Sequence, residues 1–126
     1  MIKTEVLHPD KRVSTGAYST AVLADGWLYV SGQGPIDPAT GQIVGVTIEE
    51  QTRFTLVHIG KILQAAGLNY ENVVKCTCHL GHIEEFARFN AVYAEFFPGV
   101  RPARTTVQSV LWGGIRVEID AIACAR

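Results

Sequence analysis

Three stretches in the C-terminal half of the chain alternate between apolar and polar residues, at residues 72–80, 104–111 and 115–124. An alternation of period two places successive side chains on opposite faces of a strand, so each stretch is predicted to be a strand with two unlike faces. A sheet built from such strands buries its apolar face and leaves the other face open. The pattern restricts the chain to folds in which one face of a sheet is covered.

The apolar positions of these stretches define the predicted buried face. It should carry Val74, Cys76, Cys78, Leu80, Thr105, Val107, Ser109, Leu111, Ile115, Val117, Ile119 and Ala121. The predicted open face carries Lys75, Thr77, His79, Arg104, Thr106, Gln108, Arg116, Glu118 and Asp120. Arg104 and Glu118 share the open face in this prediction, and that face should meet solvent or another subunit.

Two amphipathic helices can cover the apolar face. Thr47-Ile-Glu-Glu50 is a capping box, in which the threonine and glutamate side chains bind otherwise unpaired amide donors. A helix is predicted from there to Gly67, which is a natural stop. Its apolar stripe consists of Leu56, Ile59, Leu63 and Ala66. A second helix is predicted to end at Pro98, with a stripe of Ile83, Phe86, Asn90, Tyr93 and Phe97.

The N-terminal part is predicted to form a hairpin. Residues 20–24 and 27–31 are short apolar runs joined by Asp25-Gly26, a dipeptide that suits a two-residue turn. Residues 31–41 are rich in glycine and proline and predict an irregular loop. The order hairpin, helix, strand, helix, strand, strand predicts an α+β sandwich with a mostly antiparallel sheet and both helices on one side. We expect one domain, residues 1–126.

Composition narrows the class of protein. Hydrophobic residues make up 48% of the chain and charged residues 18%, and a small apolar domain often buries surplus apolar surface against copies of itself. The net charge of -1 provides no field that attracts nucleic acid or an anionic membrane, so neither is expected as a partner.

The sequence leads us to expect a cytoplasmic protein. Residues 1–8 lack the order of a secretory signal, and no stretch reaches the roughly 18 apolar residues that a membrane span needs. The three cysteines, Cys76, Cys78 and Cys124, are an odd number without the spacing of a disulfide scaffold. Free thiols suit a reducing compartment.

Arg104 and Glu118 are the residues best suited to chemistry. A guanidinium is permanently charged and matches a carboxylate with two parallel donors, while a glutamate can accept or deliver a proton. One residue could hold an anionic substrate while the other transfers a proton. The alternative is a cross-strand ion pair worth about 0–1 kcal/mol, and structural ion pairs outnumber catalytic ones.

A set of motifs occurs in one order along nearly the whole chain. It comprises Gly16-Ala-Tyr-Ser19, Tyr29-Val-Ser-Gly-Gln33, Asp37-Pro-Ala-Thr-Gly41, Gln51-Thr-Arg53, Asn90-Ala-Val-Tyr-Ala-Glu-Phe-Phe-Pro98, Pro102-Ala-Arg-Thr-Thr-Val-Gln108 and Val117-Glu-Ile119. In this combination the sequence resembles the RidA/YjgF family of small imine deaminases, which includes RutC-like proteins.

The resemblance implies a chorismate-mutase-like domain, with a six-stranded sheet and two helices packed on one face. It implies a homotrimer with clefts between adjacent subunits. The implied reaction is hydrolysis of reactive 2-enamine and 2-imino acids, such as 2-aminoacrylate and 2-iminopropanoate, to 2-keto acids and ammonia. The imino acid and the keto acid are the implied small-molecule partners, and no cofactor or metal is implied.

Residue by residue, the resemblance assigns the substrate carboxylate to Arg104 and the attacking water to Glu118. The predicted substrate-binding set is completed by Tyr18, Ser31, Gly32, Asn90 and Thr106. Imine hydrolysis needs an oriented substrate and an acceptor that aligns the water, and these residue types can provide both. Because 2-imino acids also hydrolyse in water alone, a sparse site without a metal or a nucleophile is sufficient.

The chain departs from the family pattern in two segments. After Gln108, relatives commonly have a small residue and a proline-containing turn, where this chain has Ser109-Val-Leu-Trp-Gly-Gly114. Relatives often have Thr-Asp where this chain has Gly81-His82. We expect Trp112 to reshape the pocket, which affects the choice of substrate more than the type of reaction.

Two other functions remain open at this stage. A deaminase specialised for another unsaturated amino acid, of the aminomuconate type, would fit the altered residues 109–114. Activity on a panel of substrates would distinguish it from a deaminase of small 2-imino acids. A non-catalytic trimer that binds a keto acid would show saturable binding without release of ammonia.

Metal binding and nuclease activity are not expected. Cys76-Thr-Cys-His79 with His82 offers ligands that suit zinc, but alternation puts the two thiols on one face and His79 on the other. Two buried thiols are the expected arrangement. Nuclease activity has been proposed for some relatives, yet the aromatic stripe of the second helix lacks interleaved lysines and predicts core and subunit contacts.

Overall fold

The computed structural model describes residues 1–11 and 16–125. Over these residues it contains six strands, two α-helices and three short 3-10 helices. The strands are β1 (Lys3–Val6), β2 (Ala21–Ala24), β3 (Trp27–Gln33), β4 (Val73–Leu80), β5 (Ala103–Gln108) and β6 (Val117–Cys124). The helices are α1 (Ile48–Ala65), η1 (Tyr70–Asn72), η2 (Ile83–Glu85), α2 (Phe86–Phe96) and η3 (Trp112–Gly114).

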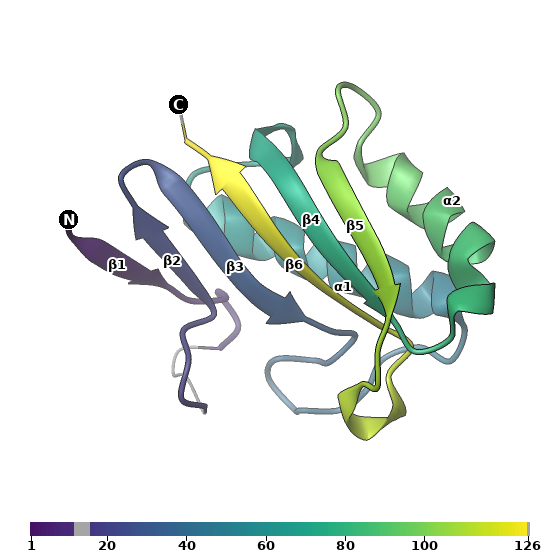
Figure 1. The fold of residues 1–126 in the computed structure, drawn as a ribbon. Coiled ribbons are helices and arrows are strands. Elements are labelled where there is room, and N and C mark those ends of the chain that lie inside the picture. The colour runs from purple at the N-terminus through teal and green to yellow at the C-terminus, as the bar shows by residue number, and fades with distance from the viewer. Residues whose placement is uncertain (12–15, 126) are drawn as a thin grey trace.

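The six strands form one sheet in the order β1-β2-β3-β6-β4-β5. Every neighbouring pair is antiparallel except β4 and β5, which are parallel. Figure 1 shows α1 behind the sheet and α2 beside β5. The predicted α+β fold, with a mostly antiparallel sheet and two helices on one face, is confirmed. The pattern of apolar residues did not predict β1, because this short edge strand buries almost no side chain and has no apolar alternation.

The hairpin of β2 and β3 forms as the Asp25-Gly26 dipeptide predicts. Asp25 has a φ of 52° and Gly26 a φ of 80°. Two positive φ values are what a tight type I′ turn requires, and its twist matches that of the flanking strands.

The end of β3 differs from the prediction, which placed a loop from residue 31 onward. β3 continues to Gln33, and its pairing with β6 shifts between Val30 and Gln33. Two residues of β3, Ser31 and Gly32, face a single residue of β6 there, which makes this a β-bulge. A strand with a bulge can contain turn-forming residues, so Gly32 did not mark the end of β3.

The first helix, α1, begins at the predicted capping box. The hydroxyl of Thr47 accepts from the amide of Glu50 at 3.1 Å, and the carboxylate of Glu50 accepts from the amide of Thr47 at 3.0 Å. The helix ends before Gly67, whose φ of 75° favours a residue without a Cβ. Its buried stripe includes Leu56, Ile59, Ile62 and Leu63.

The second predicted helix forms as η2 followed directly by α2. The aromatic side chains of Tyr93 and Phe97 are buried, as their place on the apolar stripe predicts, and Phe89 is buried with them. The helix stops just before Pro98, which lacks the amide hydrogen that a further turn would need.

The prediction of the buried face is correct for β6, which buries Val117, Ile119 and Ala121. In β4 it is wrong at one residue. The pairing of β4 with β6 shifts between Val73 and Lys75, so that Val73 is buried and Val74 is 42% exposed. The irregularity changes the phase of the alternation at the start of the strand.

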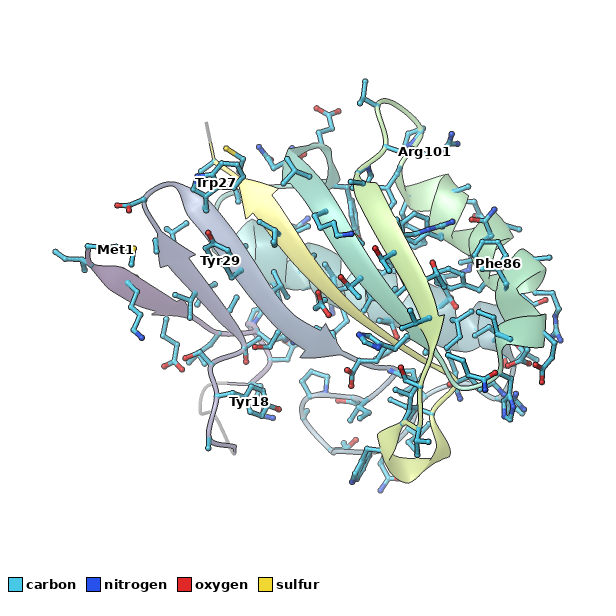
Figure 2. All side chains as sticks on the ribbon, viewed as in Figure 1. Met1, Tyr18, Trp27, Tyr29, Phe86 and Arg101 are labelled. Carbon is cyan, nitrogen blue, oxygen red and sulfur yellow. The ribbon has the colours of Figure 1, made fainter. Side chains whose placement is uncertain are left out.

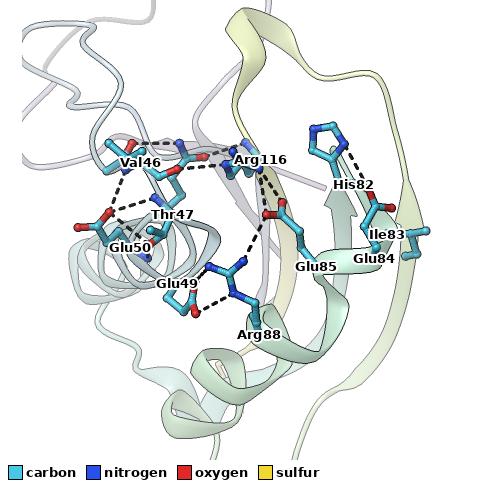
Figure 3. A network of polar contacts seen from close by, with 12 residues as sticks. Val46, Thr47, Glu49, Glu50, His82, Ile83, Glu84, Glu85, Arg88 and Arg116 are labelled. Carbon is cyan, nitrogen blue, oxygen red and sulfur yellow. Dashed lines mark hydrogen bonds and ion pairs between the residues drawn. The ribbon is translucent and has the colours of Figure 1, made fainter.

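A network of polar contacts joins the N-terminal ends of the two helices to the start of β6 (Figure 3). Nη1 of Arg116 donates to Glu85 at 3.0 Å, and Nε of Arg116 donates to the carbonyl of Val46 at 3.1 Å. Arg88 pairs with Glu49 at 2.7 Å. Arg116 was predicted on the open face, but it precedes β6 and turns toward the carboxylate of η2 instead.

Within the described residues, no helix is long and apolar enough to cross a membrane. The same residues contain no group of three His, Cys, Asp or Glu side chains that could hold a metal ion. Cys76 and Cys78 are buried on the helix side of β4, where burial raises the pKa of both thiols. His79, the next residue, faces the opposite way, as strand alternation predicts.

Candidate functional site

Arg104 lies on the helix-covered face of β5. The parallel register pairs Arg104 and Thr106 with the two buried cysteines of β4. Directly paired residues of neighbouring strands point to the same face, so both side chains face the helices. Thr105 and Val107 lie on the open face, where both are exposed. The predicted phase of β5 is therefore reversed.

Gln108 confirms this orientation of β5. Its Oε1 accepts from the amide of Ile83 in η2 at 2.9 Å, which is possible only from the helix side. Gln108 was predicted on the open face, and that prediction is wrong for the same reason as for Arg104 and Thr106.

The guanidinium of Arg104 is held by α2. Its Cζ lies 4.7 Å from the ring centre of Tyr93, 5.3 Å from that of Phe86 and 5.8 Å from that of Phe89. Nη1 of Arg104 donates to Oδ1 of Asn90 at 2.8 Å. The aromatic rings attract the cation, and the amide of Asn90 orients its fork of donors.

Arg104 and Glu118 point to opposite faces of the sheet in one chain. Glu118 alternates with Val117 and Ile119, which are both fully buried on the helix side, so its own side chain lies on the open face. The prediction that Arg104 and Glu118 share a face is wrong. Alternation requires only that Arg104 and Thr105 lie on opposite faces, and the aromatic rings of α2 decide which of the two faces inward.

Glu118 packs on the bulge of β3. A Cβ added to Gly32 would lie 2.7 Å from Oε2 of Glu118, so the carboxylate occupies space that only a glycine leaves free. On its other side, Glu118 is paired with His79 of β4. Nδ1 of His79 lies 2.9 Å from Oγ of Ser109, and its Nε2 lies 3.6 Å from Oδ2 of Asp120.

Ser31 ties the bulge to the loop that carries Tyr18. Oγ of Ser31 donates to the carbonyl of Ser19 at 2.6 Å, and the amide of Ser31 donates to the carbonyl of Thr20 at 2.9 Å. Tyr18 is 58% exposed. Figure 2 shows it in the loop that leads into β2.

Thr106 presents a hydroxyl on the same side of β5 as Arg104. Its Oγ1 is buried and makes no hydrogen bond within the described residues. A buried polar atom without a partner is unfavourable, and a ligand beside the guanidinium of Arg104 could satisfy it.

The structure thus divides the predicted site residues into two groups. The arginine group comprises Arg104, Asn90 and Thr106, on the helix side of the sheet at its β5 edge. The glutamate group comprises Glu118, Gly32, Ser31 and Tyr18, around the bulge of β3. The first group can bind an anion, and the second can exchange a proton with water.

Two features of the site were not predicted from the sequence. Phe86 and Tyr93 were predicted to make core and subunit contacts, and together with Phe89 they also form the platform beneath Arg104. Their helical spacing was visible, but it did not show that an edge strand would place an arginine over them. The position of His79 opposite Glu118 depends on the antiparallel register of β4 and β6, which no single motif reveals.

A cavity of about 340 Å³ lies next to η3. Its lining includes Gly81 and His82, and also Ser109, Val110, Leu111 and Gly114. The two segments that depart from the family pattern are therefore brought to one place by the fold. Trp112 is not part of this lining, and its side chain is 68% exposed at the tip of the loop.

Known proteins are similar in sequence to this chain along most of its length. A 2-iminobutanoate/2-iminopropanoate deaminase of Rattus norvegicus is 46% identical over 109 residues, which cover 86% of this chain and 80% of the relative. A RutC family protein of Pyrococcus horikoshii is 46% identical over 109 residues, which cover 86% of each chain.

The fold is shared as well. The crystal structure of a putative endoribonuclease from Thermotoga maritima superimposes with a TM-score of 0.92 at 39% sequence identity, over 99% of both chains. The family model described as Endoribonuclease L-PSP matches residues 9–125. The chain therefore belongs to the Endoribonuclease L-PSP family, which is also the YjgF/RidA family.

Proposed function

We propose that the protein hydrolyses 2-imino acids, and the 2-enamine acids that tautomerise to them, to 2-keto acids and ammonia. The observation that carries the proposal is that the guanidinium of Arg104 is fixed in orientation and has no carboxylate partner among the described residues. Its guanidinium is oriented by Asn90, and no carboxylate within the described residues lies within 4.0 Å of it. A fixed cation without a counter-ion suits the carboxylate of a substrate. The deaminase name of the rat relative supports the same reaction.

Four other cations differ from Arg104 because they are paired with carboxylates: Arg53 with Glu95, Arg88 with Glu49, Arg116 with Glu85, and Lys61 with Asp10. The net charge of -1 provides no field that would attract a polyanion, so RNA cleavage, which the family description names, is not the function that we propose.

We further propose that the complete site lies between two chains of a homotrimer. In one chain the arginine group and the glutamate group point away from each other, so one small substrate cannot touch both. If the open face of one subunit covers the β5 edge of the next, Glu118 of one chain meets Arg104 of the other. A ring of such head-to-tail contacts closes with three copies.

The side chains of the open face support such a contact. Trp27 is 36% exposed, Tyr29 is 48% exposed and Val107 is 39% exposed, all on the face that the helices leave uncovered. Figure 2 shows Trp27 and Tyr29 on the near face of the sheet. Exposed apolar groups that gather on one face are typical of a surface that meets a partner.

The proposed reaction balances with water as the only co-substrate. The oxygen of a water molecule bonds to the imine carbon, the electron pair of the C=N π bond moves to the nitrogen, and the carboxylate of Glu118 accepts one proton of the water. That proton then passes to the nitrogen, and the C–N bond breaks as the hydroxyl becomes the keto group. The hydroxyl proton leaves on Glu118 and joins the departing ammonia. Arg104 holds the carboxylate in place throughout.

A deaminase for a larger unsaturated amino acid is the second candidate. It is favoured by the cavity next to η3, because both departing segments line it. The difference between the two candidates concerns the substrate side chain, and the roles of Arg104 and Glu118 are the same in both. We place the reaction in the cytoplasm, where the free thiols of Cys76, Cys78 and Cys124 stay reduced.

The test is the release of ammonia and keto acid from imines made in place by an amino-acid oxidase, with small, branched and aromatic substrates. We expect the parent protein to accelerate hydrolysis, and Arg104→Ala to lower kcat/KM by about 100-fold. Arg101→Ala is the matched control, because Arg101 is an exposed cation three residues earlier. A parent protein that binds keto acids but does not accelerate hydrolysis would point to the non-catalytic trimer instead.

The position of the site between subunits is tested by mixing two inactive variants. Arg104→Ala retains Glu118, and Glu118→Gln retains Arg104. If the trimers form from a random equal mixture, each site has both residues intact with a chance of about one quarter, so about a quarter of the parental activity should return. A site within one chain would give no recovery, and light scattering would show whether the protein is a trimer.

A further inference from the structure

Gln33 connects the glutamate group to the helix layer. Its Nε2 donates to the carbonyl of Ser31 at 3.0 Å, and its Oε1 lies 2.8 Å from Nε2 of His58 in α1. Because a carbonyl only accepts, the amide nitrogen of Gln33 must face Ser31, and its oxygen must accept from His58. A chain of two hydrogen bonds therefore runs from α1 to the peptide that precedes Gly32.

His58 is fixed in place by its neighbours. It is 7% exposed, and its ring stacks on that of His8 with a centroid distance of 4.2 Å and an angle of 21°. Nδ1 of His8 accepts from the amide of Asp10 at 2.9 Å. Burial lowers the pKa of His58 to about 4, and the charges of His8 and Lys61 act in the same direction. At neutral pH His58 is uncharged, with its proton on the nitrogen that faces Gln33.

The bulge is the part of β3 that needs such support. Two residues of β3 face one residue of β6 there, and the ladder of hydrogen bonds is locally disrupted. The peptide at Ser31 and Gly32 must therefore be positioned by other contacts. Its closest catalytic neighbour is Glu118, whose carboxylate rests where a Cβ of Gly32 would be.

We propose that His58 and Gln33 are positioning residues, which hold the bulge so that the carboxylate of Glu118 stays in place to align the attacking water. The inference rests on the proposed deaminase function and assigns a role to two residues outside the predicted site. Small displacements of a reacting group are sufficient to lower a rate considerably, so the support of the bulge should affect turnover. The binding of the substrate carboxylate by Arg104 should not depend on it.

Two variants of His58 form the central experiment. His58→Phe keeps a ring that can stack on His8 but removes the donor to Gln33. His58→Gln keeps an N–H donor at a similar distance from the backbone. We expect His58→Phe to lower kcat about tenfold with KM changed by less than about twofold, and His58→Gln to recover most of the loss.

Gln33→Met tests the same link from the side of the sheet, and it also replaces the first test if His58→Phe does not fold. Because both residues act through one chain of hydrogen bonds, their effects should not add. The double variant His58→Phe/Gln33→Met should therefore be no less active than the less active of the two single variants. Additive losses would overturn the inference, as would a loss in His58→Phe that His58→Gln does not recover.

A second readout separates this inference from the deaminase proposal. The amide of Gly32 should exchange with solvent faster in His58→Phe than in the parent, and His58→Gln should restore the parental rate. If the parent has no deaminase activity but the amide behaves in this way, the proposed function fails and the structural link stands. If the Gly32 amide and kcat are both unchanged in His58→Phe, the link itself is absent.

Discussion

The carboxylate of Glu118 lies where the side chain of residue 32 would begin. A Cβ built on Gly32 falls 2.7 Å from Oε2 and 2.9 Å from Cδ of Glu118. Gly32 is not among the glycines with a positive φ, so its backbone does not require a glycine. The residue is small because the glutamate of the neighbouring strand packs against its backbone.

This contact predicts the effect of Gly32→Ala. The added methyl group must displace the carboxylate of Glu118, so kcat should fall by about 10-fold to 100-fold while the fold is retained. Gly99→Ala is the control, because a Cβ on Gly99 meets no atom within 4 Å. Steady-state kinetics of both variants checks this, and a Gly32→Ala enzyme with parental kcat would show that Glu118 is not needed in its present position.

Asn90 should affect substrate binding rather than turnover. Asn90→Leu removes the acceptor that orients the fork of Arg104, so KM should rise by about threefold to tenfold with kcat nearly unchanged. Glu95→Gln, on the exposed side of the same helix, should leave both constants at the parental values. A fall in kcat without a change in KM would contradict the role assigned to Asn90.

The burial of His58 predicts a dependence of stability on pH. Its pKa is 6.5 in the unfolded chain and about 4 in the folded state, so the unfolded chain binds the proton more readily. The free energy of unfolding should therefore decrease as the pH falls from 6.5 to about 4. The full shift corresponds to about 3 kcal/mol, and solvent screening reduces the expected loss to about 2 kcal/mol.

Urea denaturation at several pH values measures this loss. His58→Gln should flatten the curve in that range, since the group that titrates is gone. His82→Gln, which replaces an exposed histidine, should leave the slope as it is. An equal slope in the parent and in His58→Gln would assign the acid sensitivity to other groups, among them His8, whose pKa burial also lowers.

The contact between Gly60 and Tyr70 predicts a specific loss of stability. Oη of Tyr70 donates to the carbonyl of Leu56 at 2.7 Å, and its ring covers the place of a Cβ on Gly60. Gly60→Ala should lower the free energy of unfolding by about 2 kcal/mol, because the methyl group meets the phenol. In a Tyr70→Phe background the same change should cost less, and equal costs in both backgrounds would rule out this clash.

Local patterns predicted much of the fold. The capping box at Thr47, the positive φ values of Asp25-Gly26 and the alternation of β6 each depend on residues close together in the chain. Their physical causes are local, so the structure agrees with them. β1 was missed for the same reason, because an exposed edge strand has no local apolar pattern to reveal it.

The arrangement of the predicted site residues did not follow from the sequence. Alternation along β5 puts Arg104 and Thr105 on opposite faces, but it does not show which of the two faces the helices. The parallel register with Cys76 and the aromatic rings of α2 decide that, and both involve residues distant in the chain. For this reason the sequence suggested one site on one face, while the structure separates the two groups.

The sequence by itself determined the helices, most strands and the family motifs that single out Arg104 and Glu118, because these follow from spacing and residue type. Only the tertiary structure decided that the arginine faces the helices, that the glutamate rests on Gly32, and that His58 reaches the bulge through Gln33. These relationships depend on strand register, on a bulge and on the packing of a helix against the sheet. Such contacts join residues far apart in the chain, so they form only once the strands and helices have packed together.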